Sequence, residues 1–178
     1  MKKTFLQQFL FAVFLLYCIG AKATDNLITE QVVNVETAGT LASQISDDDK
    51  YKITNLKITG KINGTDLKMI REMAGSDYQG NSTDGKLATL DLSDATIVSG
   101  GEYYYSYNTS IYNYTYSTKE NELGWYAFKG CSSLVSVVIP SGVTSIDIYA
   151  FMGCSSLASI KIPSSVTSIK DYTFMVCI

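Results

Sequence analysis

The acidic side chains are the residues of this chain whose chemistry could serve catalysis. The sequence contains no histidine, which removes the usual general base near neutral pH and the commonest transition-metal ligand. A pair of carboxylates could hydrolyse a glycosidic bond, and the candidates are Asp91, Asp94, Glu102, Glu120 and Glu122. None of these lies in a catalytic motif, so we expect no enzymatic activity and no cofactor.

Two further groups could bind metal ions or form disulfides. The run Asp47-Asp48-Asp49 lacks the spaced oxygen ligands of a calcium loop and is predicted to be solvated. Cys131, Cys154 and Cys177 recur every 23 residues, so stacked strands would place them about 4.8 Å apart. Because equivalent side chains point in parallel and cysteine is a common small core residue, buried free thiols are favoured over a disulfide or a metal site.

Residues 1–23 are predicted to be a secretory signal peptide. The basic start Met1-Lys2-Lys3 precedes an apolar stretch that is too short to cross a bilayer comfortably. Ala21-Lys22-Ala23 matches a cleavage site, so the mature chain should begin near Thr24 and contain no transmembrane segment. Cys18 offers a lipid-anchored alternative, which Tyr17 disfavours because a lipobox has Gly, Ala or Ser at that place. In either form the protein is exported, to the cell surface or the extracellular space.

The composition suits one folded domain and excludes some partners. About 155 mature residues with a high apolar content can form a packed core. The formal net charge is −3 and no dense Lys/Arg cluster is present. We therefore expect neither a nucleic-acid partner nor a basic membrane-binding patch.

Self-similarity near the C-terminus is the most informative feature. Residues 126–134 return as residues 149–157, and Ile139-Pro140-Ser141 returns as Ile162-Pro163-Ser164, each after 23 residues. A further unit begins at Tyr172. Such a period is typical of a solenoid, in which each coil packs on its neighbours.

Each unit has the apolar spacing of a short strand whose side chains turn inward, and successive strands should pair in parallel. The spacing occurs in Leu134, Val137 and Ile139; Leu157, Ile160 and Ile162; Ile53, Leu56 and Ile58; and Leu87, Leu90 and Leu92. The prolines should end the strands, because proline donates no ladder hydrogen bond. Phe128, Phe151 and Phe174 should form an internal aromatic column, with Gly130 and Gly153 permitting a tight bend beside it.

The N-terminal half should contain one or two short helices. Residues 66–74 have helical apolar spacing, an acidic start and Gly75 where a C-cap belongs. A shorter helix around Leu41 and Ile45 is possible, with Thr40 as its N-cap. The chain then divides into a lead-in (24–50), degenerate capping coils (51–100), a Tyr-rich inserted loop (101–123) and regular units (124–178).

The repeated units resemble a known family. F-x-G-C-S-S-L at residues 128–134 and I-P-S-x-V-T-S-I at residues 139–146, with their copies at 151–157 and 162–169, are similar to the BspA-like class of leucine-rich repeat. The resemblance implies a leucine-rich repeat solenoid, β-dominated, with short parallel strands and the short helices in its N-terminal part. It also implies surface display and, in some members, adhesion to host matrix proteins or other bacteria.

Two surfaces are candidates for binding a protein or glycan. The first is the Tyr-rich segment, whose side chains offer a large amphipathic contact area at small entropic cost: Tyr103, Tyr104, Tyr105, Tyr107, Tyr112, Tyr114 and Tyr116. An inserted loop or strand pair that merely covers the flank is the alternative interpretation.

The second surface is the exposed strand face, where spacing aligns two rows: Asn55, Thr89, Ser136 and Ser159, and Lys57, Asp91, Val138 and Lys161. A plain solvated sheet face is its alternative.

The sequence also stops within a third unit, at Ile178. The open coil suggests a second role, a structural or assembly module that pairs through its C-terminal end. A truncated, non-functional fragment is the third possibility.

Overall fold

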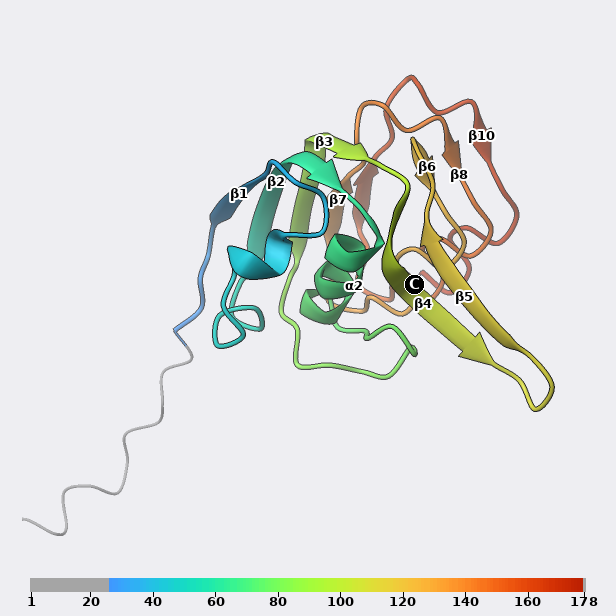
Figure 1. The fold of residues 1–178 in the computed structure, drawn as a ribbon, viewed down its shortest axis with the longest axis horizontal. Coiled ribbons are helices and arrows are strands. Elements are labelled where there is room, and N and C mark those ends of the chain that lie inside the picture. Colours follow the sequence, from blue (N-terminus) through green and yellow to red (C-terminus); the bar gives the residue numbers. More distant parts are fainter. Residues whose placement is uncertain (1–25, 178) are drawn as a thin grey trace, which may run out of the picture.

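The computed structural model describes residues 26–177, drawn in colour in Figure 1. The predicted signal peptide and Cys18 lie outside the described residues. In chain order the elements are β1 (Gln31–Val35), the 3-10 helix η1 (Leu41–Ser43), β2 (Asn55–Ile62), α2 (Gly64–Met73), β3 (Thr89–Ile97), β4 (Gly100–Asn108), β5 (Asn113–Thr118), β6 (Glu122–Leu123), β7 (Ser136–Val138), β8 (Ser145–Ile146), β9 (Ser159–Lys161) and β10 (Ser168–Ile169).

Parallel sheets dominate the architecture. Five strands pair in the order β1-β2-β3-β7-β9, and a smaller sheet pairs in the order β10-β8-β6. The apolar residues set the register of the large sheet, because Leu56 aligns with Leu90, Leu90 with Val137 and Val137 with Ile160. The predicted strand spacing is confirmed, and the arrangement is compatible with the expected solenoid.

Turns of the repeated units form a second hydrogen-bonded ladder at the far end of each coil. The N–H of Phe128 donates to the carbonyl of Ala150 at 2.7 Å, and that of Gly130 donates to Met152 at 2.8 Å. One unit later, Phe151 donates to Thr173 and Gly153 to Met175. Gly130 and Gly153 have φ angles of 74° and 73°, which confirms the predicted bends.

The phenylalanine column is internal at Phe128 and Phe151, as predicted, whereas Phe174 is 36% exposed. Phe128 and Phe151 are fully buried and stack with ring centroids 5.3 Å apart, and Phe174 stacks on Phe151 at 5.6 Å. Cys131, Cys154 and Cys177 are free thiols beside the column. The thiol of Cys154 donates to the carbonyl of Phe128, and that of Cys177 to Phe151.

A buried arginine starts the turn ladder. Arg71, on α2, is completely shielded from solvent, and its guanidinium donates to the carbonyls of Tyr126, Ala127 and Lys129 at 2.9–3.0 Å. Ala127 and Lys129 occupy the same places in their unit as Ala150 and Met152 do in the next, whose carbonyls accept backbone N–H groups. Arg71 thus supplies the donors that a preceding turn would supply.

The helix is confirmed, with a start two residues earlier than predicted. Asp66 is the third helical residue rather than the first, and it forms a capping box with Asn63. The same buried carboxylate accepts N–H groups from Gly39 and Leu41 at 2.6 and 2.9 Å, so it fastens the lead-in to α2. Gly75, with φ of 99°, follows the C-cap.

The lead-in differs from the expectation in two ways. It contains a strand, β1, whose Val33 and Val35 are buried against the sheet. The short helix is a single 3-10 turn, and Thr40 makes no side-chain cap. Its hydroxyl instead donates to the carbonyl of Thr37 at 2.7 Å, which leaves it pointing away from the helical N–H groups.

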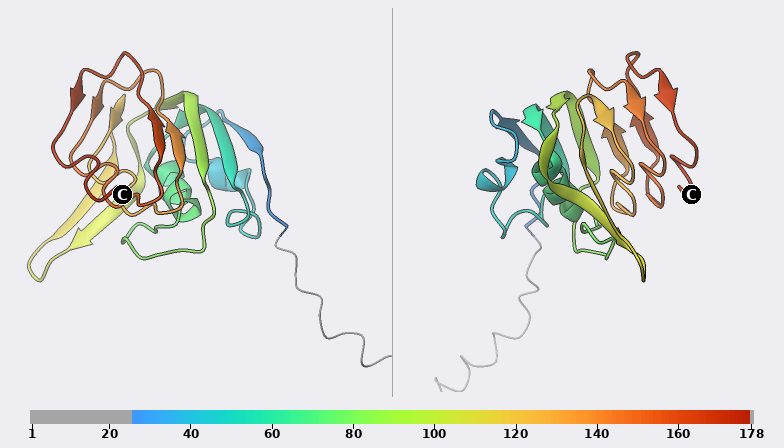
Figure 2. Two further views of the ribbon diagram at one scale, coloured as in Figure 1. Left: turned by 180° about the vertical axis from the view of Figure 1, so that it is seen from behind. Right: turned by 45° about the vertical axis from the view of Figure 1, so that its right-hand side comes forward.

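The Tyr-rich segment is a strand pair. β4 and β5 are antiparallel, with Tyr105 opposite Tyr116 and Tyr107 opposite Tyr114. The ribbon projects beyond the parallel sheets, as all three views show (Figures 1 and 2). Its base packs against α2 and the repeat turns, whereas its tip stands free.

Candidate binding surfaces

The strand face carries both polar rows in the predicted alignment. Asn55 pairs in register with Thr89, Thr89 with Ser136 and Ser136 with Ser159. Lys57, Asp91, Val138 and Lys161 form the second row in the same way. The parallel register therefore brings side chains that are far apart in the sequence onto one exposed surface.

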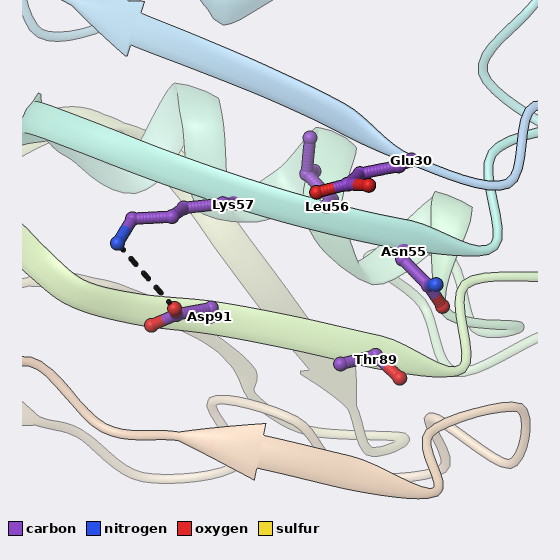
Figure 3. Close-up of a pocket in the computed structure, with 6 residues that line it drawn as sticks. All are labelled: Glu30, Asn55, Leu56, Lys57, Thr89 and Asp91. Carbon is purple, nitrogen blue, oxygen red and sulfur yellow. Dashed lines mark ion pairs between the residues drawn. The ribbon is translucent and has the colours of Figure 1, made fainter.

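A shallow groove crosses these rows at the N-terminal end of the sheet (Figure 3). It has a volume of about 310 Å³ and is lined by Glu30, Asn55, Leu56, Lys57, Thr89 and Asp91. The carboxylate, amide and hydroxyl groups there can hydrogen-bond a polar ligand.

Lys57 is held between two carboxylates, at 2.6 Å from Asp94 and 3.6 Å from Asp91. The hydrogen bond with Asp94 raises the pKa of Lys57. Burial opposes ionisation of Asp91, but hydrogen bonds from Ser93 and the ammonium of Lys57 lower its pKa overall. The raised pKa of Lys57 and the lowered pKa of Asp91 both favour the charged forms, so opposite charges lie side by side in the groove.

The predicted tyrosines separate into two classes. Tyr104 and Tyr105 are only 1% and 2% exposed, because they anchor the ribbon to the body and cannot reach a ligand. The hydroxyl of Tyr104 donates to the carbonyl of Trp125. Exposed rings are found at Tyr103, Tyr107, Tyr112 and Tyr114, and Tyr116 is half-buried.

The exposed tyrosines do not form one cluster. Tyr107, Tyr112 and Tyr114 lie on the outer part of the ribbon, where Tyr112 and Tyr114 are in ring contact. Tyr103 lies apart, edge-on to Tyr78 and near Lys68. The ribbon tip, defined as residues 107–114, therefore carries most of the exposed tyrosines of the segment.

A second set of tyrosines extends the aromatic surface and was missed by sequence reasoning. Tyr126, Tyr149 and Tyr172, called the turn column below, stack at 5.3 and 5.4 Å. Tyr116 meets Tyr126 edge-on at 5.2 Å and stacks on Trp125 at 6.1 Å. The ribbon and the repeats thus share one aromatic surface. The sequence does contain a signal for the turn column, because a tyrosine precedes the Ala-Phe or Thr-Phe pair of each repeat.

Lys129 fastens the ribbon to the turn column. Its ammonium donates to the hydroxyl oxygen of Tyr105 at 2.9 Å and lies 5.0–6.0 Å from the ring centroids of Tyr105, Tyr107 and Tyr126. Cation–π contacts of this kind stabilise by about 0.5–2 kcal/mol. They fix the direction in which the ribbon projects.

We predict that stability falls steeply in alkaline solution. Burial raises the pKa of Tyr126 to about 12, and burial also raises the pKa of Tyr104 and Tyr116. In the unfolded chain tyrosine ionises near pH 10. Between about pH 10 and pH 12 the unfolded state therefore binds fewer protons than the folded state, and unfolding becomes more favourable as pH rises.

Urea unfolding measured at increasing pH, beside the tyrosinate absorbance of the folded protein, checks this. Tyr104→Phe should flatten the decline. A free energy of unfolding that stays constant across that range would contradict the burial of these phenols.

The three cysteine thiols have low reactivity in this fold. Burial raises the pKa of Cys131 to about 11 and also raises the pKa of Cys154 and Cys177. Little thiolate forms at neutral pH, so these cysteines act as core residues. Within residues 26–177, no three His, Cys, Asp or Glu side chains come together as a potential metal site.

Comparison with known proteins identifies the family to which this chain belongs. A search of curated proteins gives no significant match. No helix among the described residues has the length and apolar character needed to span a membrane. The model of the BspA type leucine rich repeat region, with six copies, matches residues 83–178, more than half of the chain. Such repeats generally form non-enzymatic interaction scaffolds, often on proteins that are surface-exposed or extracellular. The chain belongs to the family of BspA-type leucine-rich repeat proteins.

Proposed function

We propose that this chain is an exported recognition protein, an adhesin that binds host or microbial proteins or glycans through a leucine-rich repeat solenoid. The observation that carries the proposal is the projecting ribbon. Its tip exposes Tyr107, Tyr112 and Tyr114 together with Ile111, which is 76% exposed. Monomeric soluble proteins seldom expose a contiguous group of large side chains that serves no contact.

The composition and rigidity of the ribbon support recognition. Residues 103–118 contain no charged side chain and consist mainly of Tyr, Ser, Thr and Asn. Such surfaces combine rigid aromatic contacts with adaptable hydrogen bonds, as antibody binding loops do. Because Tyr104, Tyr105 and Lys129 fix the ribbon at its base, less conformational entropy is lost when a partner binds.

The strand face is the second proposed contact. Lys57, Asp91 and Lys161 lie in one row with Val138, beside a row of small polar residues. A mixed, weakly charged surface of this kind suits a polar protein or glycan partner, and it should contribute specificity more than affinity. The N-terminal sequence supports export, with release after Ala23 favoured over a lipid anchor at Cys18.

Binding of the purified chain to immobilised matrix proteins and polysaccharides tests the proposal. Replacing residues 107–114 with a Gly/Ser linker removes the tip and leaves Tyr104, Tyr105 and Tyr116 in place. We expect binding to weaken at least about tenfold, because buried aromatic anchors dominate interface energetics.

A matched variant, Lys57→Ala with Lys161→Ala, reports on the strand face separately and should weaken binding less. Full binding by the tip variant to every captured ligand would refute the role of the ribbon.

A structural or assembly role is the second candidate. Apolar side chains gather on the last described turn and its flank: Ile169, Tyr172, Phe174, Met175 and Val176 are all at least 36% exposed. Such a patch can pair with another solenoid. Analytical ultracentrifugation over a range of concentrations decides, since a stable monomer throughout would exclude self-association through this turn.

A further inference from the structure

We propose that the turn column is a binding site for a neutral, β-linked polysaccharide, whose successive sugar units lie along Tyr126, Tyr149 and Tyr172. This inference rests on the proposed recognition function and names its ligand class. For a polysaccharide ligand it adds a contact on the repeats to the contact proposed at the ribbon tip.

The first observation is a row of identical phenol side chains whose hydroxyls have no hydrogen-bond partner among the described residues. The three rings are nearly parallel, with interplanar angles of 8° and 18°. Stacked rings cover each other's faces, so the column offers ring edges and hydroxyls rather than flat faces. None of the three hydroxyls is hydrogen-bonded to another residue within 26–177. Each can donate and accept one hydrogen bond with a ligand hydroxyl.

The second observation is backbone strain at these positions. Tyr126, Tyr149 and Tyr172 have φ angles of 60°, 60° and 58°, in the left-handed region that a bulky side chain rarely adopts. Residues held in such sparsely populated regions are strained, and they cluster at functional sites. The first two of these turns place glycine at their other left-handed position, Gly130 and Gly153, and the third places Val176 there, with φ of 60°. Tyrosine therefore stands where glycine would be free of strain.

The spacing selects a repeating ligand. The ring centroids lie 5.3 and 5.4 Å apart, which matches a polymer whose successive units advance by the same interval. An extended polypeptide repeats its side chains on one face only every ~6.6–6.8 Å. One pyranose ring with its bridging oxygen advances a β-linked chain by a length close to the tyrosine spacing.

The surrounding charges favour a neutral polymer. The ammonium of Lys129 already donates to the hydroxyl of Tyr105 and lies over the ring of Tyr126. Asp147, Lys170 and Asp171 precede the second and third tyrosines and carry both signs. A polyanion would meet two carboxylates there, and its binding would not gain from a basic patch. Trp125 and Tyr116 extend the aromatic surface at the Tyr126 end, where a sugar ring can stack.

Affinity electrophoresis of the full chain in gels that contain hydroxyethylcellulose tests the inference, with the α-linked polymer dextran as the control gel. We expect retardation in hydroxyethylcellulose alone. The triple variant Tyr126→Phe, Tyr149→Phe and Tyr172→Phe keeps the stack and loses only the hydroxyls, so the dissociation constant should rise at least about tenfold. Its thermal unfolding should match that of the parent, because no described hydrogen bond is lost.

Two further variants keep the test specific. Tyr149→Gly removes the central ring and its backbone strain together, and it should abolish retardation. Lys61→Ala, at an exposed site on β2 outside the proposed contact residues, should leave retardation unchanged. Equal retardation of the parent and the triple variant, or none for the parent, would overturn the inference. If the parent passes the gel freely yet binds a matrix protein through its ribbon tip, this inference fails and the proposed function stands.

Discussion

Replacing Arg71 with methionine should lower the free energy of unfolding by about 3–5 kcal/mol, because several buried carbonyls lose their donors at about 1–3 kcal/mol each. The guanidinium serves the carbonyls of Tyr126, Ala127 and Lys129 and also that of Asp77. Methionine fills a similar volume and donates nothing. For a chain of this size the midpoint of thermal unfolding should fall by about 6–20 °C.

The effect should be specific to the place of Arg71 at the start of the turn ladder. Since α2 replaces a preceding coil there, the variant should open the turn at 126–130 before the strands separate. Fluorescence of Trp125, the only tryptophan, reports on this turn, and circular dichroism reports on the whole chain. Lys61→Met, at an exposed site on β2, is the matched control and should change stability by less than about 0.5 kcal/mol.

Arg71→Lys should restore part of the loss, because an ammonium donates up to three hydrogen bonds but lacks the planar fork. A loss below about 1 kcal/mol in Arg71→Met would show that water or other groups satisfy these carbonyls, and the role assigned to the arginine would then be wrong.

Replacing Phe151 with alanine should be comparably destabilising, by about 3–5 kcal/mol. Its ring is fully buried and is stacked on both sides, at 5.3 Å from Phe128 and 5.6 Å from Phe174. Truncation leaves a cavity between two coils that are held by hydrogen bonds on either side. The surroundings therefore cannot collapse freely, which places the loss toward the upper end of that range.

Urea unfolding measures this loss, with two matched variants. Phe151→Leu keeps most of the volume and should cost less than about 1.5 kcal/mol. Phe174→Ala, at a ring that is 36% exposed, should cost clearly less than Phe151→Ala. Equal losses at both phenylalanines would mean that burial in the column does not determine their contribution.

The repeat sequence predicted the strands and their register because the signal was periodic. Leu56, Leu90, Val137 and Ile160 occupy one inward row, so the polar residues between them had to align as well. The helix start was misplaced by two residues because Asp66 was taken as the first residue rather than as the third residue of a capping box with Asn63.

Features that depend on tertiary partners were not predictable in the same way. Arg71 has the character of a solvated helix residue, and only the carbonyls of a turn 55 residues later explain its burial. The buried state of Tyr104 and Tyr105 depends on Trp125 and Lys129, which lie beyond the ribbon. The turn column has a local signal in the tyrosine that recurs in each repeat. β1 has one in the apolar residues of Gln31–Val35. Neither signal was recognised as a distinct feature of the sequence.

The central claim is that recognition takes place on the shared aromatic surface. Hydrogen–deuterium exchange of the full chain, free and saturated with a ligand that it captures from the matrix-protein and polysaccharide panel, tests this claim most directly. We predict slower exchange in the ribbon tip and in the turns at 126–130 and 149–153, with α2 unchanged. Protection confined to other surfaces, or a panel in which nothing is captured, would contradict the account.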